Sequence, residues 1–279
     1  MKLLRLAAFI SVAAASAWAQ APSIAAGGVL DGASFARGQA VAPGSLVSIF
    51  GGALANALQQ NDTVPLSTSI GGVSVTMNNV PAGLYFVSSG QINAQVPWNV
   101  LSSGSNGTAN VVVTRNGQAS APLAIQIAPY TAAIFTLTPG GSGYALAINA
   151  DGSVVAPAGT FPGIASRPAK VGETIVIYAN GLGPVDAAIA NGANSLDRLR
   201  NTTTVPVVNI GGTSAKVVFS GLAPQFPGVN QLNVTIPDIA ANNSAPVSIT
   251  IGGQTTPTGP ILAISRQAGH LPGMGVVLL

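Results

Sequence analysis

The chain has 279 residues, of which 48% are hydrophobic, only 6% are charged and none is cysteine. Without cysteine, disulfides and metal–thiolate sites are excluded, so the fold must be held together by packing and backbone hydrogen bonds. The formal charge of +3 and the scarcity of lysine and arginine disfavour nucleic-acid binding, which depends on many contacts to phosphate.

Residues 1–19 have the pattern of a cleaved secretory signal peptide. Lys2 and Arg5 precede an apolar stretch at 6–15, and the small-x-small triplet Ala17-Trp18-Ala19 closes the segment. The apolar stretch is shorter than the ~20 residues that span a bilayer, which favours cleavage over a membrane anchor. No later stretch is apolar for long enough to span a membrane. We therefore expect the mature chain to be secreted or exposed at the cell surface, without a membrane span.

The remainder of the chain predicts an all-β protein. Its 34 glycines and 20 prolines are too many for long helices. Short runs of β-branched residues lie between Gly, Pro and Asn, at 45–50, 73–77 and 110–114. Tight hairpin turns are expected at three dipeptides that tolerate positive φ, namely Asn116-Gly117, Asp151-Gly152 and Asn180-Gly181.

An internal repeat divides this β-rich chain into two units. The motif Gln-Ile/Leu-Asn-x-x-Val/Ile-Pro occurs at 91–97 and again, 140 residues later, at 231–237. Alternation along the first copy predicts a half-buried strand with Ile92, Ala94 and Val96 inward and the amide side chains outward. Two upstream matches accompany the motif: Ile70-Gly71-Gly72 with Ile210-Gly211-Gly212, and residues 43–49 with 171–177.

The repeat predicts two tandem immunoglobulin-like β-sandwich domains of about 100 residues each, which together fill the length left after the leader. We place the first domain at 26–128 and the second at 144–266. The Gly- and Pro-rich stretch 129–143 is interpreted as a linker, and the second domain is expected to begin with a hairpin around Asp151-Gly152. Residues 267–279 have no counterpart in the repeat and are interpreted as a tail.

Motifs along nearly the whole chain after the leader resemble an uncharacterised C-terminal domain family of secreted acidobacterial (Solibacter-type) proteins. The residues that carry the resemblance are Ala33-Ser34-Phe35, Val41-Ala42-Pro43-Gly44-Ser45, Tyr85-Phe86-Val87-Ser88 and 91–98 in the first half, and 147–153 and 178–185 in the second. The resemblance implies a bacterial, extracellular setting, and the family has no established activity or catalytic residues to carry over. The tail after Ser265 is not matched.

Each repeat is also similar, more loosely, to IPT/TIG domains, in which the pattern Gly-x-x-Val-x-Ile-x-Gly opens an immunoglobulin-like sandwich. Residues 44–51 fit this pattern. The second copy, at 172–179, fits less well because its closing glycine is displaced to Gly181. The resemblance implies an IPT/TIG-like sandwich for each domain.

The sequence offers little for catalysis, and we expect no enzyme activity, cofactor or metal site. The only histidine, His270, lies in the tail, so a Ser-His-Asp triad is not expected. The seven carboxylates are scattered and lie mostly in or beside turns, where such side chains cap backbone amides. Carboxylates that converge only in the fold would still allow a hydrolase. No spacing of acids typical of a calcium loop occurs.

The residues best suited to recognition are aromatic. Tyr85, Phe86 and Trp98 bracket the first Gln-x-Asn strand, and Asp238 stands in the second copy where Trp98 stands in the first. An aromatic present in one copy only predicts a ligand-binding patch or an interface between the domains. Ordinary packing at a strand end is the alternative.

Three hypotheses about function remain. The leading one is a non-catalytic extracellular interaction, adhesion or scaffolding module, whose partner would be a surface protein or a polysaccharide. The second is a carbohydrate-binding accessory protein, and the third is an extracellular hydrolase that its sequence does not reveal. Low charge and many strands also favour self-association through sheet edges.

Overall fold

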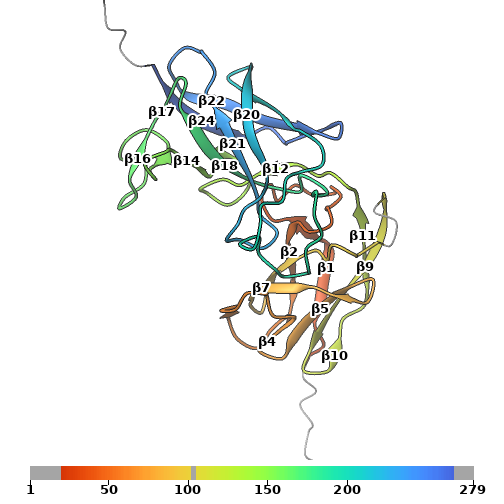
Figure 1. Ribbon diagram of the computed structural model, residues 1–279. Coiled ribbons are helices and arrows are strands. Elements are labelled where there is room, and N and C mark those ends of the chain that lie inside the picture. The colour runs from red at the N-terminus through yellow and green to blue at the C-terminus, as the bar shows by residue number, and fades with distance from the viewer. Residues whose placement is uncertain (1–19, 102–104, 267–279) are drawn as a thin grey trace, which may run out of the picture.

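The computed structural model describes residues 20–101 and 105–266, so the expected leader (1–19) and tail (267–279) lie outside the described residues. The described residues form 24 strands joined by turns and loops, and none of them lies in a helix. Accordingly, no described helix could cross a membrane. Figure 1 shows two bodies, one built from the red-to-yellow first half of the chain and one from the green-to-blue second half. The all-β prediction is confirmed.

The first domain is a sandwich of two sheets. Its strands are β1 (Ser23–Asp31), β2 (Leu46–Gly52), β3 (Gln59–Gln60), β4 (Ser69–Ile70), β5 (Val73–Met77), β6 (Val80–Pro81), β7 (Gly83–Val87), β8 (Gln91–Gln95), β9 (Gly107–Arg115), β10 (Gln118–Ala119) and β11 (Leu123–Ile127). One sheet has the order β1-β2-β8-β7-β3, and in the other β5 and β11 flank β9. This is the A-B-E-D and C-F-G arrangement of constant-type immunoglobulin domains.

The second domain repeats this plan. Its strands are β12 (Ala133–Ile134), β13 (Gly143–Tyr144), β14 (Ala147–Ile148), β15 (Val154–Val155), β16 (Ser166–Arg167), β17 (Ala169–Lys170), β18 (Thr174–Asn180), β19 (Val207–Ile210), β20 (Thr213–Leu222), β21 (Asn230–Thr235), β22 (Asn242–Ile251), β23 (Gln254–Thr255) and β24 (Pro260–Ser265). One change is that β20 belongs to both sheets, because its first residues pair with β19 and its later residues pair with β21. Another is the set of short strands β13, β15 and β16, which pair with β24, β14 and β15 and have no counterpart in the first domain.

Each domain has its own hydrophobic core, and the two cores share no residue. In the first core Ile92, Ala94 and Val96 are fully buried, and their counterparts in β21 and after it are buried in the second core. Burying a side chain such as Ile or Val stabilises a fold by roughly 1.5–3 kcal/mol. The inward face predicted from alternation is therefore the face that holds each sandwich together.

The two Gln-x-Asn strands occupy equivalent places. β8 lies between β2 and β7, and β21 lies between β18 and β20. The neighbouring D strands even share a β-bulge at the same position, with Tyr85 as the extra residue in β7 and Val218 as the extra residue in β20. A bulge re-aims the side chain at that point. The motif at 91–97 and 231–237 is thus a true structural repeat.

The Gly-Gly match is not a structural equivalence, which corrects one part of the predicted repeat. In the first domain β5, which pairs with β9, follows Gly71-Gly72. In the second domain the equivalent strand β19, which pairs with β22, precedes Gly211-Gly212. By position, Gly211-Gly212 corresponds to Asn78-Asn79, which connects β5 to β6. All three dipeptides have positive φ. The sequence match therefore reflects shared turn chemistry and not a shared position.

Two further expectations are wrong. Residues 129–143 do not form a plain linker, because β12 pairs with β18 and Ala132 and Ile134 belong to the second core. Asn180-Gly181 is not a hairpin turn, because Asn180 ends β18 and only Gly181 has positive φ. The hairpins expected at the other two dipeptides are present, between β9 and β10 and between β14 and β15.

Candidate functional site

The carboxylates that converge in the fold do so on an arginine. Arg167 donates to Asp151 Oδ2 at 2.6 Å and to both oxygens of Glu173, at 2.6 and 2.9 Å. These bonds lower the pKa of Glu173 to about 2 and hold the pKa of Asp151 below its usual range. A general acid at neutral pH needs a raised pKa. With their pKa values lowered, these two carboxylates are unsuited to act as general acids at neutral pH.

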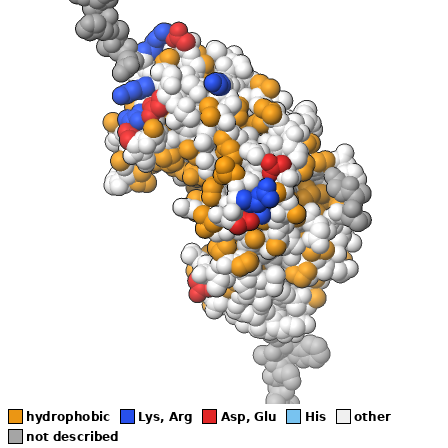
Figure 2. All heavy atoms as spheres, viewed as in Figure 1, with side chains coloured by type: hydrophobic (Ala, Val, Ile, Leu, Met, Phe, Trp, Pro, Cys, Tyr) orange, Lys and Arg blue, Asp and Glu red, His pale blue; other side chains and the backbone are white. Residues whose placement is uncertain are grey.

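Charged groups on the surface are few, and four ion pairs join some of them: Arg167 with Asp151 and Glu173, Arg200 with Asp197, and Arg266 with Asp238. Figure 2 shows several of them on the visible face in small groups where lysine or arginine lies near aspartate or glutamate, while others stand apart on uncharged polar and apolar surface. Within residues 20–101 and 105–266, no three His, Cys, Asp or Glu side chains lie together in a way that could hold a metal ion. Rings, amides and hydroxyls are therefore the groups that most of this surface offers to a ligand.

Asn180, at the end of β18, joins the two domains. Its fully buried side chain enters the first domain, where Nδ2 donates to Asp31 Oδ2 at 2.7 Å and to the Leu46 carbonyl at 2.8 Å. Its Oδ1 accepts from Leu46 N at 2.9 Å. The amide thus pairs with Leu46 as a neighbouring strand would. Because every one of these groups is hydrogen-bonded, the contact fixes β18 against β2.

A loop of the second domain makes a further set of contacts across the junction. Gly192 N donates to Gln95 Oε1 at 2.7 Å, and the Gly192 carbonyl accepts from Leu66 N at 2.8 Å. The neighbouring Asn191 accepts from Trp98 N through Oδ1, at 2.8 Å. The junction is therefore held by directed hydrogen bonds at separated points, which restrains rotation of one domain against the other.

The structure separates the three aromatic residues that the sequence singled out. The Tyr85 hydroxyl donates to the Pro227 carbonyl of the second domain at 2.7 Å, and burial raises the pKa of Tyr85. The Trp98 ring packs on Gly44 so closely that a Cβ there would lie 2.3 Å from it. Phe86 lies on β7 opposite Asn93, and within the described residues no hydrogen bond or ring contact links it to the other two. Tyr85 and Trp98 are at the domain junction, and Phe86 is on the sheet face.

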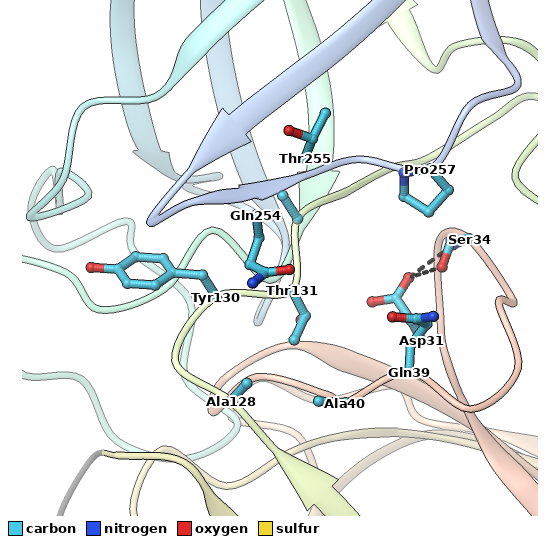
Figure 3. Close-up of a pocket in the computed structure, with 11 residues that line it drawn as sticks. Asp31, Ser34, Gln39, Ala40, Ala128, Tyr130, Thr131, Gln254, Thr255 and Pro257 are labelled. Atoms are coloured by element: carbon cyan, nitrogen blue, oxygen red, sulfur yellow. Dashed lines mark hydrogen bonds between the residues drawn. The ribbon is translucent and has the colours of Figure 1, made fainter.

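A first hollow lies at the junction and measures ≈ 190 Å³. Figure 3 shows Asp31 and Ser34 pointing toward one another on one side of it, with Gln39 beside Asp31 and Tyr130 turned away on the opposite side. Burial raises the pKa of Asp31, and hydrogen bonds from Ser34, Ala33 and Asn180 oppose the rise. Because these donors occupy both carboxylate oxygens, Asp31 is a structural cap and not a free reactive group.

A second hollow, of ≈ 230 Å³, lies on the outer face of the A-B-E-D sheet of the first domain. Its aromatic lining is contributed by Phe35, Tyr85 and Phe135, the last from the start of the second domain, and its polar lining by Ser48 and Asn93. A third hollow, of ≈ 300 Å³, lies on the same face and is lined by Phe35, Phe50, Arg37 and the backbone around Gly27. We call these two hollows, which share Phe35, the sheet-face groove.

Phe35 stands between the two parts of the sheet-face groove in a strained conformation. Its φ is +54°, a left-handed value that is rare for a bulky residue. The strain is maintained by the turn before it, in which Phe35 N donates to the Asp31 carbonyl and the Asp31 carboxylate accepts from Ser34. The Phe35 ring lies 6.3 Å from that of Phe50. Strain of this kind persists where the surroundings enforce it, often at functional sites.

The polar part of the sheet-face groove is held in one orientation. Asn93 Oδ1 accepts from Ser48 Oγ at 3.0 Å and from Gln91 Nε2 at 2.8 Å. These two bonds identify which atom of the Asn93 side-chain amide is the oxygen and which is the nitrogen. Asn93 Nδ2 has no hydrogen-bond partner within the part of the chain that the structure describes. A ligand in the groove would therefore meet a fixed amide donor between aromatic rings.

The second domain carries a related arrangement. Gln231 Nε2 donates to Asn233 Oδ1 at 2.9 Å, as in the first copy. Gln231 also lines a hollow of ≈ 220 Å³ together with Tyr178 and Phe226, whose rings meet edge to face at 6.1 Å. The hydrophobic cores use only the inward residues of these two strands. The outward amides therefore have no role in the cores, yet in both domains they lie beside aromatic rings. Sequence reasoning predicted that these amides face outward but did not choose them, Phe35 or Phe135 as site residues.

Comparison with known proteins identifies no family. No protein-family model matches the sequence, and no curated protein matches it. Among solved structures, similarity is found to SGBP-B of the Bacteroides ovatus mixed-linkage glucan utilization locus, in complex with a mixed-linkage heptasaccharide, at 12% identity and a TM-score of 0.33 over 81% of this chain and 43% of that one. Domains 5–6 of the S-layer protein SbsC match at 9% identity and a TM-score of 0.28, over 88% and 99%. The chain spans less than half of SGBP-B. Because the TM-scores are low, the immunoglobulin-like assignment rests on the order of the strands in the two sheets and not on these similarities.

Proposed function

We propose that the protein is a non-catalytic extracellular binding module, in which two docked immunoglobulin-like domains present the sheet-face groove to a ligand. The observation that carries the proposal is the groove itself: two hollows meet at Phe35, whose backbone is held at a φ of +54°. A concave site with rings around a few oriented polar groups is the usual form of a binding site.

Docking of the second domain supports this role because it completes the groove. Phe135 and the Pro227 carbonyl, which holds the Tyr85 hydroxyl, come from the second domain, whereas the other lining residues come from the first. The Asn180 contacts fix one domain against the other. Restraint before binding lowers the entropy cost of binding.

A non-enzymatic role is supported by the state of the carboxylates. Glu173 and Asp151 share Arg167, and Asp31 is saturated with donors. None of these acids lines the sheet-face groove. An extracellular setting is part of the same proposal and is supported by the leader pattern, while the resemblance to the acidobacterial family stays a prediction.

The test is retention of cell-surface and extracellular-matrix fractions on the immobilised protein, compared with its Phe35→Gly variant. Glycine suits a φ of +54°, so the variant should fold while the ring between the two hollows is lost. The matched control is Asn116→Gly, which replaces another residue with positive φ, in the β9–β10 hairpin. Retention that Asn116→Gly preserves and Phe35→Gly abolishes is expected. Equal retention by both variants would refute the groove as the binding site.

A further inference from the structure

We infer that the ligand of the sheet-face groove is an uncharged carbohydrate chain of at least two sugar residues. The inference rests on the proposed function and names its ligand class. It follows from the chemistry of the groove lining, from the backbone pairing beneath it and from the way its two parts meet.

The lining matches the two kinds of surface that a sugar ring presents. The apolar C–H face of a sugar packs on aromatic rings, and Phe35, Phe50, Tyr85 and Phe135 supply rings along the groove. Sugar hydroxyls need partners for hydrogen bonds, and Asn93 lines the same hollow as three of these rings. Its Nδ2 can donate because its Oδ1 is already occupied by Ser48 and Gln91.

Other ligand classes fit this lining less well. An apolar helix would bury the Asn93 donor without a partner, which carries a desolvation cost. A phosphate or nucleic-acid ligand would need several cations, and Arg37 is the one charged side chain among the residues that line the two hollows. A peptide that adds a strand needs a free sheet edge. Beneath the groove, β2 is paired on both sides, with β1 and with β8. β1, which lines the third hollow, is the edge strand of this sheet, but a peptide that paired with it would lie in the plane of the sheet and not over the face that forms the groove.

The division of the groove sets a minimum ligand length. The hollows of ≈ 230 and ≈ 300 Å³ meet at Phe35 and lie along the same face. One sugar ring in each would place the Phe35 ring between or beneath two consecutive residues. We therefore expect oligosaccharides to bind and the corresponding monosaccharide to bind at least about tenfold more weakly, because it fills one hollow only.

The first experiment measures binding of the leaderless protein to an array of neutral oligosaccharides that covers hexoses and pentoses in α and β linkages, with affinities of positive probes determined by calorimetry. Phe35→Gly is expected to weaken binding about tenfold or more, and Asn116→Gly to leave it unchanged. Unfolding curves of both variants confirm that each is folded at the assay temperature.

The second experiment tests the amide donor with an isosteric change. Asn93→Asp keeps an oxygen to accept from Ser48 and Gln91 but replaces Nδ2 with an acceptor. It should weaken binding about tenfold or more. Asn233→Asp makes the same change in the equivalent pair of the second domain and should leave the affinity for the same probe unchanged. Equal affinity of Asn93→Asp and the unaltered protein would overturn the role given to this donor.

The outcomes separate the inference from the proposed function. Binding of a neutral oligosaccharide that depends on Phe35 supports both. No binding across the array, with Phe35-dependent retention of a non-carbohydrate surface component, overturns the carbohydrate inference and leaves the binding module standing. Absence of Phe35-dependent binding in both assays overturns both.

Discussion

Replacing Asn180 with alanine should uncouple the two domains. The side chain is fully buried and makes three hydrogen bonds, two with the backbone of Leu46 and one with the Asp31 carboxylate. Asn180→Ala leaves the amide of Leu46 and one oxygen of Asp31 without their partner. The Leu46 carbonyl keeps a second donor, Gly32 N at 2.9 Å, whereas the Leu46 amide and Asp31 Oδ2 have no other hydrogen-bond partner among the described residues.

The magnitude follows from the cost of buried groups left without a hydrogen bond, which is about 1–3 kcal/mol for each group. Two such groups set an upper limit of about 6 kcal/mol, but they share one site, their costs are not additive and water can enter the vacated space. We expect a loss of about 3–5 kcal/mol. That is a large part of the ~5–15 kcal/mol by which a folded domain is normally stable.

The assay is urea unfolding followed by two probes. Trp98 fluorescence reports the junction, and far-ultraviolet circular dichroism reports strands of both domains. The two probes should coincide for the unaltered protein and separate for Asn180→Ala, with the Trp98 transition at lower urea. The control is Asn149→Ala, which removes a buried amide that bonds only within the second domain. Coincident probes in Asn180→Ala, or a loss below about 0.5 kcal/mol, would refute the reasoning.

Two other predictions concern local contacts. Gly44→Ala and Gly212→Ala both place a side chain at positive φ, at a backbone cost of about 1 kcal/mol. A Cβ at Gly44 would also collide with the Trp98 ring, whereas a Cβ at Gly212 would face open space. Gly44→Ala should therefore lose about 1–3 kcal/mol more in thermal unfolding, and equal losses would contradict the close packing. Because the Glu173 pKa is lowered from 4.5 to about 2, the stability it contributes is present above about pH 4.5 and lost as the pH falls toward 2. Urea unfolding at pH 6 to 2 should show this loss, and Arg167→Gln should flatten it; an unchanged profile in that variant would exclude the ion pair as its source.

Local sequence patterns were sufficient for the fold. Alternating β-branched residues predicted the strands at 45–50, 73–77 and 110–114, which overlap β2 (from Leu46), β5 and β9. The same alternation predicted which side of the Gln-x-Asn strands faces each core. These features depend on the two-residue period of a strand and on the burial of one face, both of which are written in neighbouring residues.

The domain junction could not be predicted in the same way. Asn180-Gly181 has the composition of a hairpin turn, yet the Asn180 side chain is hydrogen-bonded to Leu46, 134 residues earlier in the chain. Gln95 lies on the outward face of its strand, as predicted, but is 1% exposed because Gly192 of the second domain covers it. Docking between loops has no local period, so only the folded chain reveals it.

The candidate site was found in part. Tyr85 was singled out for its position in one copy of the repeat, and it lines the sheet-face groove. Phe35 was quoted within a motif but not chosen, because its left-handed backbone depends on the Asp31 turn. The signal that could have led to Asn93 was present: an outward amide pair recurs in both copies, where packing alone asks only for polarity.

The passage of β20 through both sheets has a consequence for how the second domain comes apart. Its residues Thr213–Ala215 belong to one sheet and Lys216–Leu222 to the other. Unfolding of either sheet therefore also disrupts the strand that the other sheet shares with it. In the first domain the corresponding segments, β6 and β7, are separate strands. Amide protons of the second sandwich should accordingly exchange with solvent as one cooperative unit, whereas the two layers of the first can open at different rates.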